Sequence, residues 1–167
     1  MKARVAASVA LALAIVFGTA GCGFYTPQAT TKHYDASDGV SGNVGQIDVR
    51  NAMVIVDSKG EVGNLSVTLV NTDSKSHLLT IKGGDSTAEG VQVSVQPGQV
   101  KILGQNPKSS SASNVFIPNL TAQPGTLLPI FFQYGDQTGL KLQVPVLNGQ
   151  LPQYNHLVPP AILPASK

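Results

Sequence analysis

Apolar and polar residues alternate in several short stretches of this chain, with a period of two residues. Leu65, Val67 and Leu69 alternate with polar residues, and residues 140–144 repeat the pattern. Successive side chains of a β-strand point to opposite faces, so this alternation predicts strands with one buried face. The same pattern, or a short apolar run between turn residues, predicts further strands at residues 46–56, 77–81, 91–95, 100–102, 115–117 and 126–134.

Glycine and proline separate these predicted strands. Turn pairs stand at Pro97-Gly98 and Pro124-Gly125, and residues 58–60 and 83–85 are rich in turn formers. No stretch after the first 21 residues shows helical periodicity over ten residues. Many short strands joined by such turns predict an all-β domain over residues 46–147, an antiparallel β-sandwich with Greek-key connections.

The first residues of the chain have a different pattern, with two basic residues followed by an apolar run. Lys2 and Arg4 precede the uncharged residues 5–17, and small residues follow. This order is typical of a secretory signal, and residues 5–21 together are close to the lower limit of the roughly 20 residues that span a membrane. Thr19-Ala20-Gly21-Cys22 is similar to the cleavage box of bacterial lipoproteins. We therefore expect residues 1–21 to be a lipoprotein signal peptide and Cys22 to carry lipid on its thiol.

Two further segments flank the predicted domain. Residues 22–45 contain few apolar residues and many turn formers, so we expect the lipidated cysteine to be followed by a flexible tether. Residues 148–167 are rich in proline and cannot join a central strand. This C-terminal tail is expected either to pack in extended form over the domain or to be disordered.

Charge narrows the range of partners. The chain has 11 basic and 9 acidic residues, and removal of Lys2 and Arg4 with the signal leaves 9 of each. No basic field would remain to attract nucleic acid. The single cysteine allows no internal disulfide, and lipidation explains its presence in an exported protein. The expected location is the extracytoplasmic face of the cell membrane, with the membrane contacted through the lipid anchor.

Residues suited to catalysis or metal binding are few and scattered. His33, His77 and His156 fall in the tether, a strand and the tail. His77 shares a strand face with Leu79 and Ile81, which indicates a histidine at the edge of the core. Met53 is expected to share a face with Ile47, Val49 and Ile55 and to pack in the core.

No motif of a known catalytic centre accompanies these residues. The sequence contains no Gly-x-Ser-x-Gly nucleophile motif, no phosphate-binding loop and no cluster of ligands with metal-site spacing. We expect no enzymatic activity, no catalytic residues and no cofactor. Met53 and His77 are the remaining candidates for a copper ligand, because Cu(I) prefers thioether and imidazole ligands.

Several of the predicted strands resemble the periplasmic copper chaperone family PCu(A)C. Residues 47–52, 65–71, 119–130 and 140–146 carry this resemblance, which covers about residues 46–147. Within the family the chain is most similar to actinobacterial LpqE-type lipoproteins, a resemblance that includes residues 100–107. The resemblance implies a cupredoxin-like β-sandwich and an extracytoplasmic role near copper delivery to a respiratory oxidase.

The copper ligands of that family are His-x-Met pairs, which this chain lacks. Asn114 and Phe116 stand where the resemblance would place one pair, and residues 91–95 lack the other. The resemblance therefore implies the fold of that family without its copper site. We expect a membrane-anchored, non-catalytic binding or assembly module, associated with a respiratory oxidase through a membrane-protein partner.

Two alternatives differ from this expectation in what the domain carries. The first is a copper carrier with a degenerate site built from Met53, His77 or His156. The second is a carrier of a small apolar ligand in a cavity of the sandwich. Proximity of Met53 and His77 would favour copper, a large apolar pocket would favour the carrier, and an exposed apolar patch would favour a protein partner.

Overall fold

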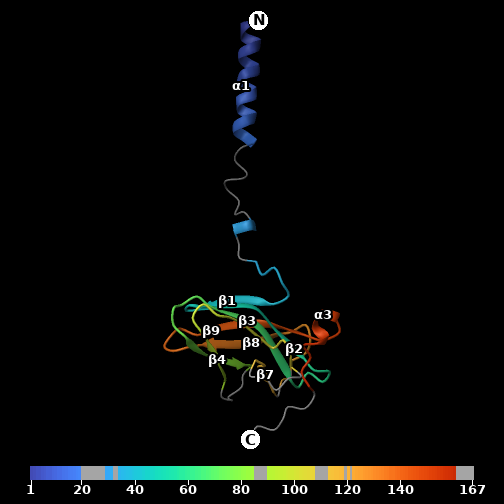
Figure 1. Cartoon of the computed structure of the whole chain (residues 1–167). Helices are drawn as coiled ribbons and strands as arrows, with labels where there is room; N and C mark the ends of the chain where they lie inside the picture. The colour runs from blue at the N-terminus through green and yellow to red at the C-terminus, as the bar shows by residue number, and fades with distance from the viewer. Residues whose placement is uncertain are drawn as a thin grey trace. The chain divides into compact units, whose positions relative to one another are not determined.

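The computed structural model describes residues 1–19, 29–31, 34–84, 90–107, 113–118, 120 and 122–160. The chain divides into two compact units, Met1–Tyr34 and Asp35–Lys167. The first unit contains helix α1 (Lys2–Thr19) and the short 3-10 helix η1 (Ala29–Thr31), and Figure 1 shows both. Among the described helices none is long and apolar enough to cross a membrane. The predicted lipidation site, Cys22, lies outside the described residues.

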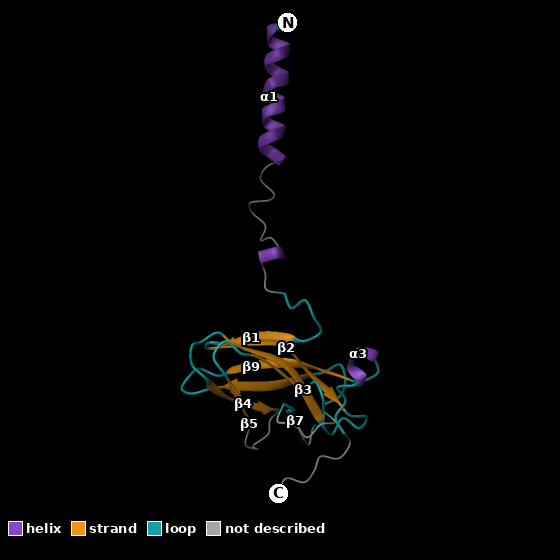
Figure 2. Ribbon diagram, in the orientation of Figure 1, coloured by secondary structure: helices purple, strands orange, loops and turns teal. Residues whose placement is uncertain are grey.

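The second unit is an all-β domain, as the alternating sequence pattern predicted. Figure 2 shows it built almost wholly of strands and connecting loops. Its elements are β1 (Val40–Val44), β2 (Ile47–Val56), β3 (Gly63–Asn71), β4 (His77–Gly83), β5 (Val91–Val95), β6 (Val100–Leu103), β7 (Phe116–Ile117), β8 (Leu127–Gln133), β9 (Leu140–Leu147) and α3 (Pro152–Asn155).

The strands form one nine-stranded sheet in the order β5-β4-β8-β9-β2-β3-β6, with β1 paired to β2 and β7 paired to β3. Strand β9 connects two parts of this sheet. Its residues 140–145 pair antiparallel with β8, and Val146 and Leu147 pair parallel with Val54 and Ile55 of β2. The predicted antiparallel pairing holds for every other pair of described strands, and the sheet is mixed because β9 continues past β8 and runs alongside β2.

One continuous apolar core is enclosed by the strands. Strand β3 contributes the alternating set Leu65, Val67 and Leu69, each at most 1% exposed, as predicted. Phe132 of β8 and Leu79 of β4 are fully buried in the same cluster. The same core includes residues of β5 and β6, the strands at the two ends of the sheet order. The strands therefore form one domain.

A β-bulge in β2 changes which side chains face this core. Arg50 pairs with Thr68 and Met53 pairs with Ser66, so two residues of β2 lie opposite one residue of β3. Asn51 at the bulge has a positive φ of 50°. Since one extra residue reverses the alternation of faces, Met53 does not share a face with Val49, contrary to the sequence-based expectation.

Asn51 also attaches the residues that precede β1. Its Oδ1 accepts hydrogen bonds from Gly39 N (3.0 Å) and Ser37 Oγ (2.6 Å), and its own N–H donates to Ser41 Oγ (3.2 Å). A Cβ on Gly39 would lie 2.6 Å from the carbonyl carbon of Asn51, so this close approach requires glycine. The bulge is therefore held by the chain segment that enters the domain.

The domain begins earlier than the sequence pattern predicted. Residues 40–44, assigned to the flexible tether 22–45, form β1 and pair with β2. Val44 is 1% exposed and belongs to the main core. This segment has few apolar residues, so backbone pairing with β2 adds to the burial of Val44 in holding it in the sheet.

The described part of the C-terminal tail, residues 148–160, packs against the domain. Tyr154 and Leu157 are buried on Met53 and Ile55, on the face of β2 opposite the main core. The Tyr154 hydroxyl donates a hydrogen bond to the Asp38 carboxylate. Packing over the domain was one of the two stated alternatives, although the short helix α3 replaces the expected extended form.

Candidate ligand-binding pocket

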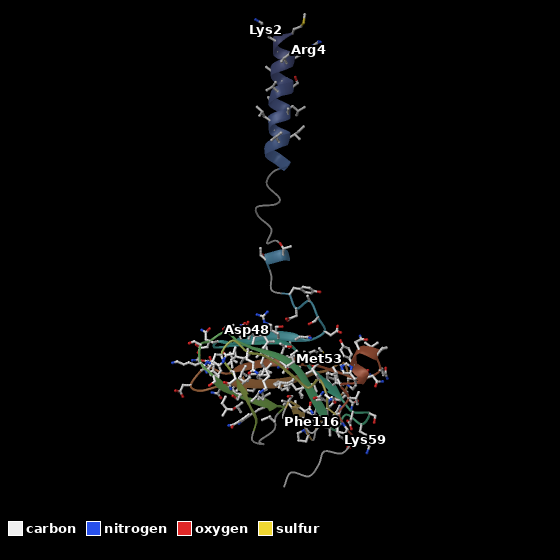
Figure 3. All side chains as sticks on the ribbon, viewed as in Figure 1. Lys2, Arg4, Asp48, Met53, Lys59 and Phe116 are labelled. Carbon is white, nitrogen blue, oxygen red and sulfur yellow. The ribbon has the colours of Figure 1, made fainter. Side chains whose placement is uncertain are left out.

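Three chain segments far apart in the sequence meet at one end of the β domain and line an open pocket of about 470 Å³. Figure 3 shows Lys59 in the β2–β3 turn, which provides one wall. The volume lies within the roughly 300–1,000 Å³ that is usual for small-molecule sites. The lining residues are Val56, Asp57, Ser58, Lys59, Gly60, Gln123, Pro124, Asn148, Gly149, Gln150 and Val158.

Asp57 is a buried acidic residue of this wall, with 6% of its surface exposed. Its Oδ1 accepts hydrogen bonds from Glu61 N (2.9 Å) and Val62 N (3.3 Å), and its carbonyl accepts one from Gly60 N (3.1 Å). An aspartate at the first position of a tight turn commonly makes such bonds to the following backbone. Its Oδ2 has less than 1 Å² exposed and no hydrogen-bond partner in the described part of the chain.

The remaining walls combine amide and apolar side chains. Asn148 Oδ1 accepts a hydrogen bond from Gln150 N (3.2 Å), which closes the turn after β9. The carbonyl of Gln123 accepts bonds from the backbone N (3.1 Å) and hydroxyl (2.7 Å) of Thr126. Pro124 and Val158 add apolar surface. The pocket is thus partly polar and built by loops, unlike the apolar sandwich cavity that the second alternative requires.

The C-terminal segment is held in place from inside the domain. Asn64 is completely buried, and its Nδ2 donates to Leu157 O (2.9 Å) and to Gly104 O (2.8 Å). The hydrogen bond from Tyr154 to Asp38 fixes the same segment at a second point, and it raises the pKa of Tyr154, with burial as a further cause. These contacts position the residues 148–150 and Val158 that line the pocket.

His77 lies at the edge of the core with two close partners. Its Nε2 is 2.8 Å from Asp73 Oδ2, and its ring centroid is 4.3 Å from that of Tyr134. The hydrogen bond to His77 lowers the pKa of Asp73 from its ordinary value, and a backbone bond from Ser74 adds to the effect. This environment agrees with the interpretation of His77 as a hydrogen-bonded residue of the core edge.

The structure does not bring the copper candidates together. Met53 packs with Ile55, Tyr154 and Leu157, whereas His77 contacts Asp73 and Tyr134. In the described part of the chain no group of three or more His, Cys, Asp or Glu side chains is arranged to hold a metal ion.

The other described residues considered from the sequence do not line this pocket. His156 is exposed at the end of α3, and His33 lies outside the described residues. Asn114 precedes β7 and its Nδ2 donates to Asn106 O (2.8 Å), while Phe116, labelled in Figure 3, is half-buried in β7. Neither side chain is a metal ligand of the kind the resemblance describes.

Exchange of Met53 for leucine should change stability little. Met53 is 5% exposed in a small apolar cluster, and Met53→Leu preserves volume, which usually costs under about 1.5 kcal/mol. Urea unfolding of the two proteins measures this difference. If Met53→Leu lowered the free energy of unfolding by several kcal/mol, packing could not be the role of the thioether. Ile55→Val, on the same face of β2, is the matched control.

Exposed apolar side chains gather on β6, at the end of the sheet order. Val100 and Ile102 are 59% and 51% exposed, and Val100 pairs with the half-buried Val70 of β3. The sequence correctly predicted this strand without indicating that its alternating residues face outward. Such a surface was the stated indication of a protein partner.

Asp57 and the amide residues of the pocket were not predicted from the sequence. The turn at residues 58–60 was recognised, and an aspartate before such a turn is a weak signal of a buried cap. Strand pairing brings the residues near 57, 123 and 148 together, so no local pattern in the sequence indicates that they meet. Comparison of the chain with protein-family models and with curated proteins gives no match.

Proposed function

We propose that this chain is a membrane-anchored lipoprotein of the extracytoplasmic face, with a non-catalytic β domain that serves in binding and assembly. The observation that carries this proposal is the order of its parts: an apolar helix with a basic start, a lone cysteine, and then a separate β domain. Figure 3 labels Lys2 and Arg4 at the beginning of α1. The apolar side chains of α1, Val9, Leu11 and Leu13 among them, are exposed, as suits a segment recognised by a secretion machinery.

The finer fold assignment is part of the same proposal. We assign the domain to a cupredoxin-like Greek-key sandwich, in which the segments resembling the PCu(A)C and LpqE-type proteins overlap with β2, β3, β8 and β9. These four strands lie at the centre of the sheet order or beside it and surround the main core. Association with a membrane protein such as a respiratory oxidase rests on this resemblance. The exposed Val100 and Ile102 of β6 are consistent with a protein contact.

Substitution of Cys22 by alanine should abolish lipid attachment. The thiol is the only one in the chain, and a hydroxyl or methyl group cannot form the thioether to a lipid donor. Cells fed an alkyne fatty acid should label the unaltered protein and leave Cys22→Ala unlabelled, as precursor or released protein. Thr19→Leu is the control, because it keeps the thiol and brings the box closer to the commonest lipoprotein pattern. Equal labelling of the alanine variant would refute the anchor.

A further inference from the structure

We infer that Asn148-Gly149, in the turn between β9 and the C-terminal segment, is a site of spontaneous deamidation, and that its isoaspartate product loosens residues 150–158 from the domain. It is the one place in the chain where glycine follows asparagine. The inference goes beyond the proposed function, because this covalent change of the β domain needs neither the lipid anchor nor a binding partner.

The reaction begins with attack of the Gly149 backbone nitrogen on the side-chain carbonyl carbon of Asn148. A C–N bond forms, the proton of the N–H passes through water to the side-chain amide group, and that group leaves as ammonia. The product is a five-membered succinimide ring. Water then breaks one of the two ring C–N bonds. Cleavage at the side-chain carbon gives aspartate, and cleavage at the backbone carbon gives isoaspartate, so water is the sole co-reactant.

The conformation of the turn favours this attack. Asn148 Oδ1 accepts a hydrogen bond from Gln150 N (3.2 Å), which folds the side chain back over the peptide group of Gly149. The same N–H donates to the oxygen on which negative charge develops during the attack, as a backbone donor does in an oxyanion hole. In the described part of the chain Gly149 N has no hydrogen-bond partner. The attacking nitrogen is therefore not held by another acceptor.

The Asp38-Gly39 pair has the opposite arrangement and serves as an internal comparison. An aspartate before glycine can form the same succinimide, with loss of water in place of ammonia. Here Gly39 N donates to Asn51 Oδ1 (3.0 Å), and the Asp38 carboxylate accepts the hydrogen bond of the Tyr154 hydroxyl. Both reacting groups are thus held by other partners, so we expect this pair to react far more slowly than Asn148-Gly149.

The position of Gly149 explains why the product would loosen the C-terminal segment. A Cβ on Gly149 would lie 2.1 Å from Val158 Cγ2 and 3.6 Å from Asn155 Cα, so the segment packs directly on this glycine. Isoaspartate at position 148 adds one carbon to the backbone immediately before Gly149 and displaces this contact. Either product also adds a second carboxylate to the pocket that Asp57 lines, and like charges repel. Both effects weaken the attachment of residues 150–158.

A test ages the full chain in detergent micelles in mildly alkaline buffer and follows each asparagine by proteolytic digestion and fragmentation mass spectrometry. Asn148 should convert to more isoaspartate than aspartate, on the order of tenfold faster than Asn155, which is exposed in α3 and is followed by His156. Asp38 should stay unchanged over the same period. The rate at Asn148 should be similar in the folded chain and in urea.

Two results of this measurement would overturn the inference. The first is conversion of Asn148 no faster than that of Asn155. The second is protection of Asn148 by folding of about tenfold or more relative to the chain in urea, because the turn would then oppose the attack.

Hydrogen exchange tests the structural consequence, with Asn148→Ser as the matched variant. Serine keeps an oxygen that can accept the hydrogen bond of Gln150 N, and it has no amide carbonyl with which to form the ring. Residues 150–158 should exchange about threefold or more faster in the aged unaltered protein, while β3 exchanges as before. Aged Asn148→Ser should show no change. Unchanged exchange in fully converted protein, or equal acceleration in aged Asn148→Ser, would refute the loosening.

Discussion

Val67→Asp is expected to unfold the β domain. Val67 is 1% exposed in β3, which pairs with β2 on one side and β6 on the other. An aspartate there would bury a charge among Leu65, Leu69 and the rest of the main core. Burial of an unpaired charge costs several kcal/mol, comparable with the whole stability of about 5–15 kcal/mol that a domain has.

Urea unfolding followed by far-ultraviolet circular dichroism measures this effect. Val100→Asp introduces the same side chain on the exposed face of β6 and is the matched control. It should change the free energy of unfolding by about 0.5 kcal/mol or less, as is usual for surface positions. If the two variants unfolded at the same urea concentration, Val67 could not face the core.

Asn64→Leu should loosen the C-terminal segment and lower the stability of the domain by about 1–3 kcal/mol. The substitution removes the donor that Gly104 O and Leu157 O share, and each buried acceptor left without a partner costs about 1–3 kcal/mol. It also removes Asn64 Oδ1, which has no partner in the described part of the chain, and this offsets part of the loss. Leucine has a similar size, so cavity formation contributes little.

Two measurements distinguish local loosening from a general loss of stability. Hydrogen exchange and limited proteolysis should show residues 148–158 opening before the strands do. Asn43→Leu is the control, because Asn43 is exposed in β1 and its amide bonds to the side chain of Asp48. Unchanged protection of the C-terminal segment in Asn64→Leu would mean that the two carbonyl contacts do not hold it.

Much of the candidate site could not be derived from the sequence. The pocket needs Asp57 on the β2–β3 turn, Gln123 before β8 and Asn148 after β9 in one place. Each residue has an ordinary local explanation as a turn former. Their convergence follows from β9 pairing with both β8 and β2, a contact between residues far apart in the chain.

By itself the sequence determined the class of the domain, its strands from β2 to β9, and the burial of the alternating residues of β3. The alternation of Leu65, Val67 and Leu69 is a local property of an extended backbone with one face away from water, so it can be recognised without knowing the partner strand. The same holds for Pro97-Gly98 and Pro124-Gly125, since turn preference is local. The lipid attachment at Cys22 lies outside the described residues and stays a prediction.

Only the tertiary structure decided which partner each strand takes and which face Met53 occupies. The bulge at Asn51 reverses the alternation of β2, and its side chain accepts hydrogen bonds from Gly39 and Ser37 of another segment. Strand β1 joins the sheet because its backbone groups need those of β2. Long-range pairing is stabilised by backbone hydrogen bonds that every residue type except proline can make in full, so the identity of the residues carries little information about it.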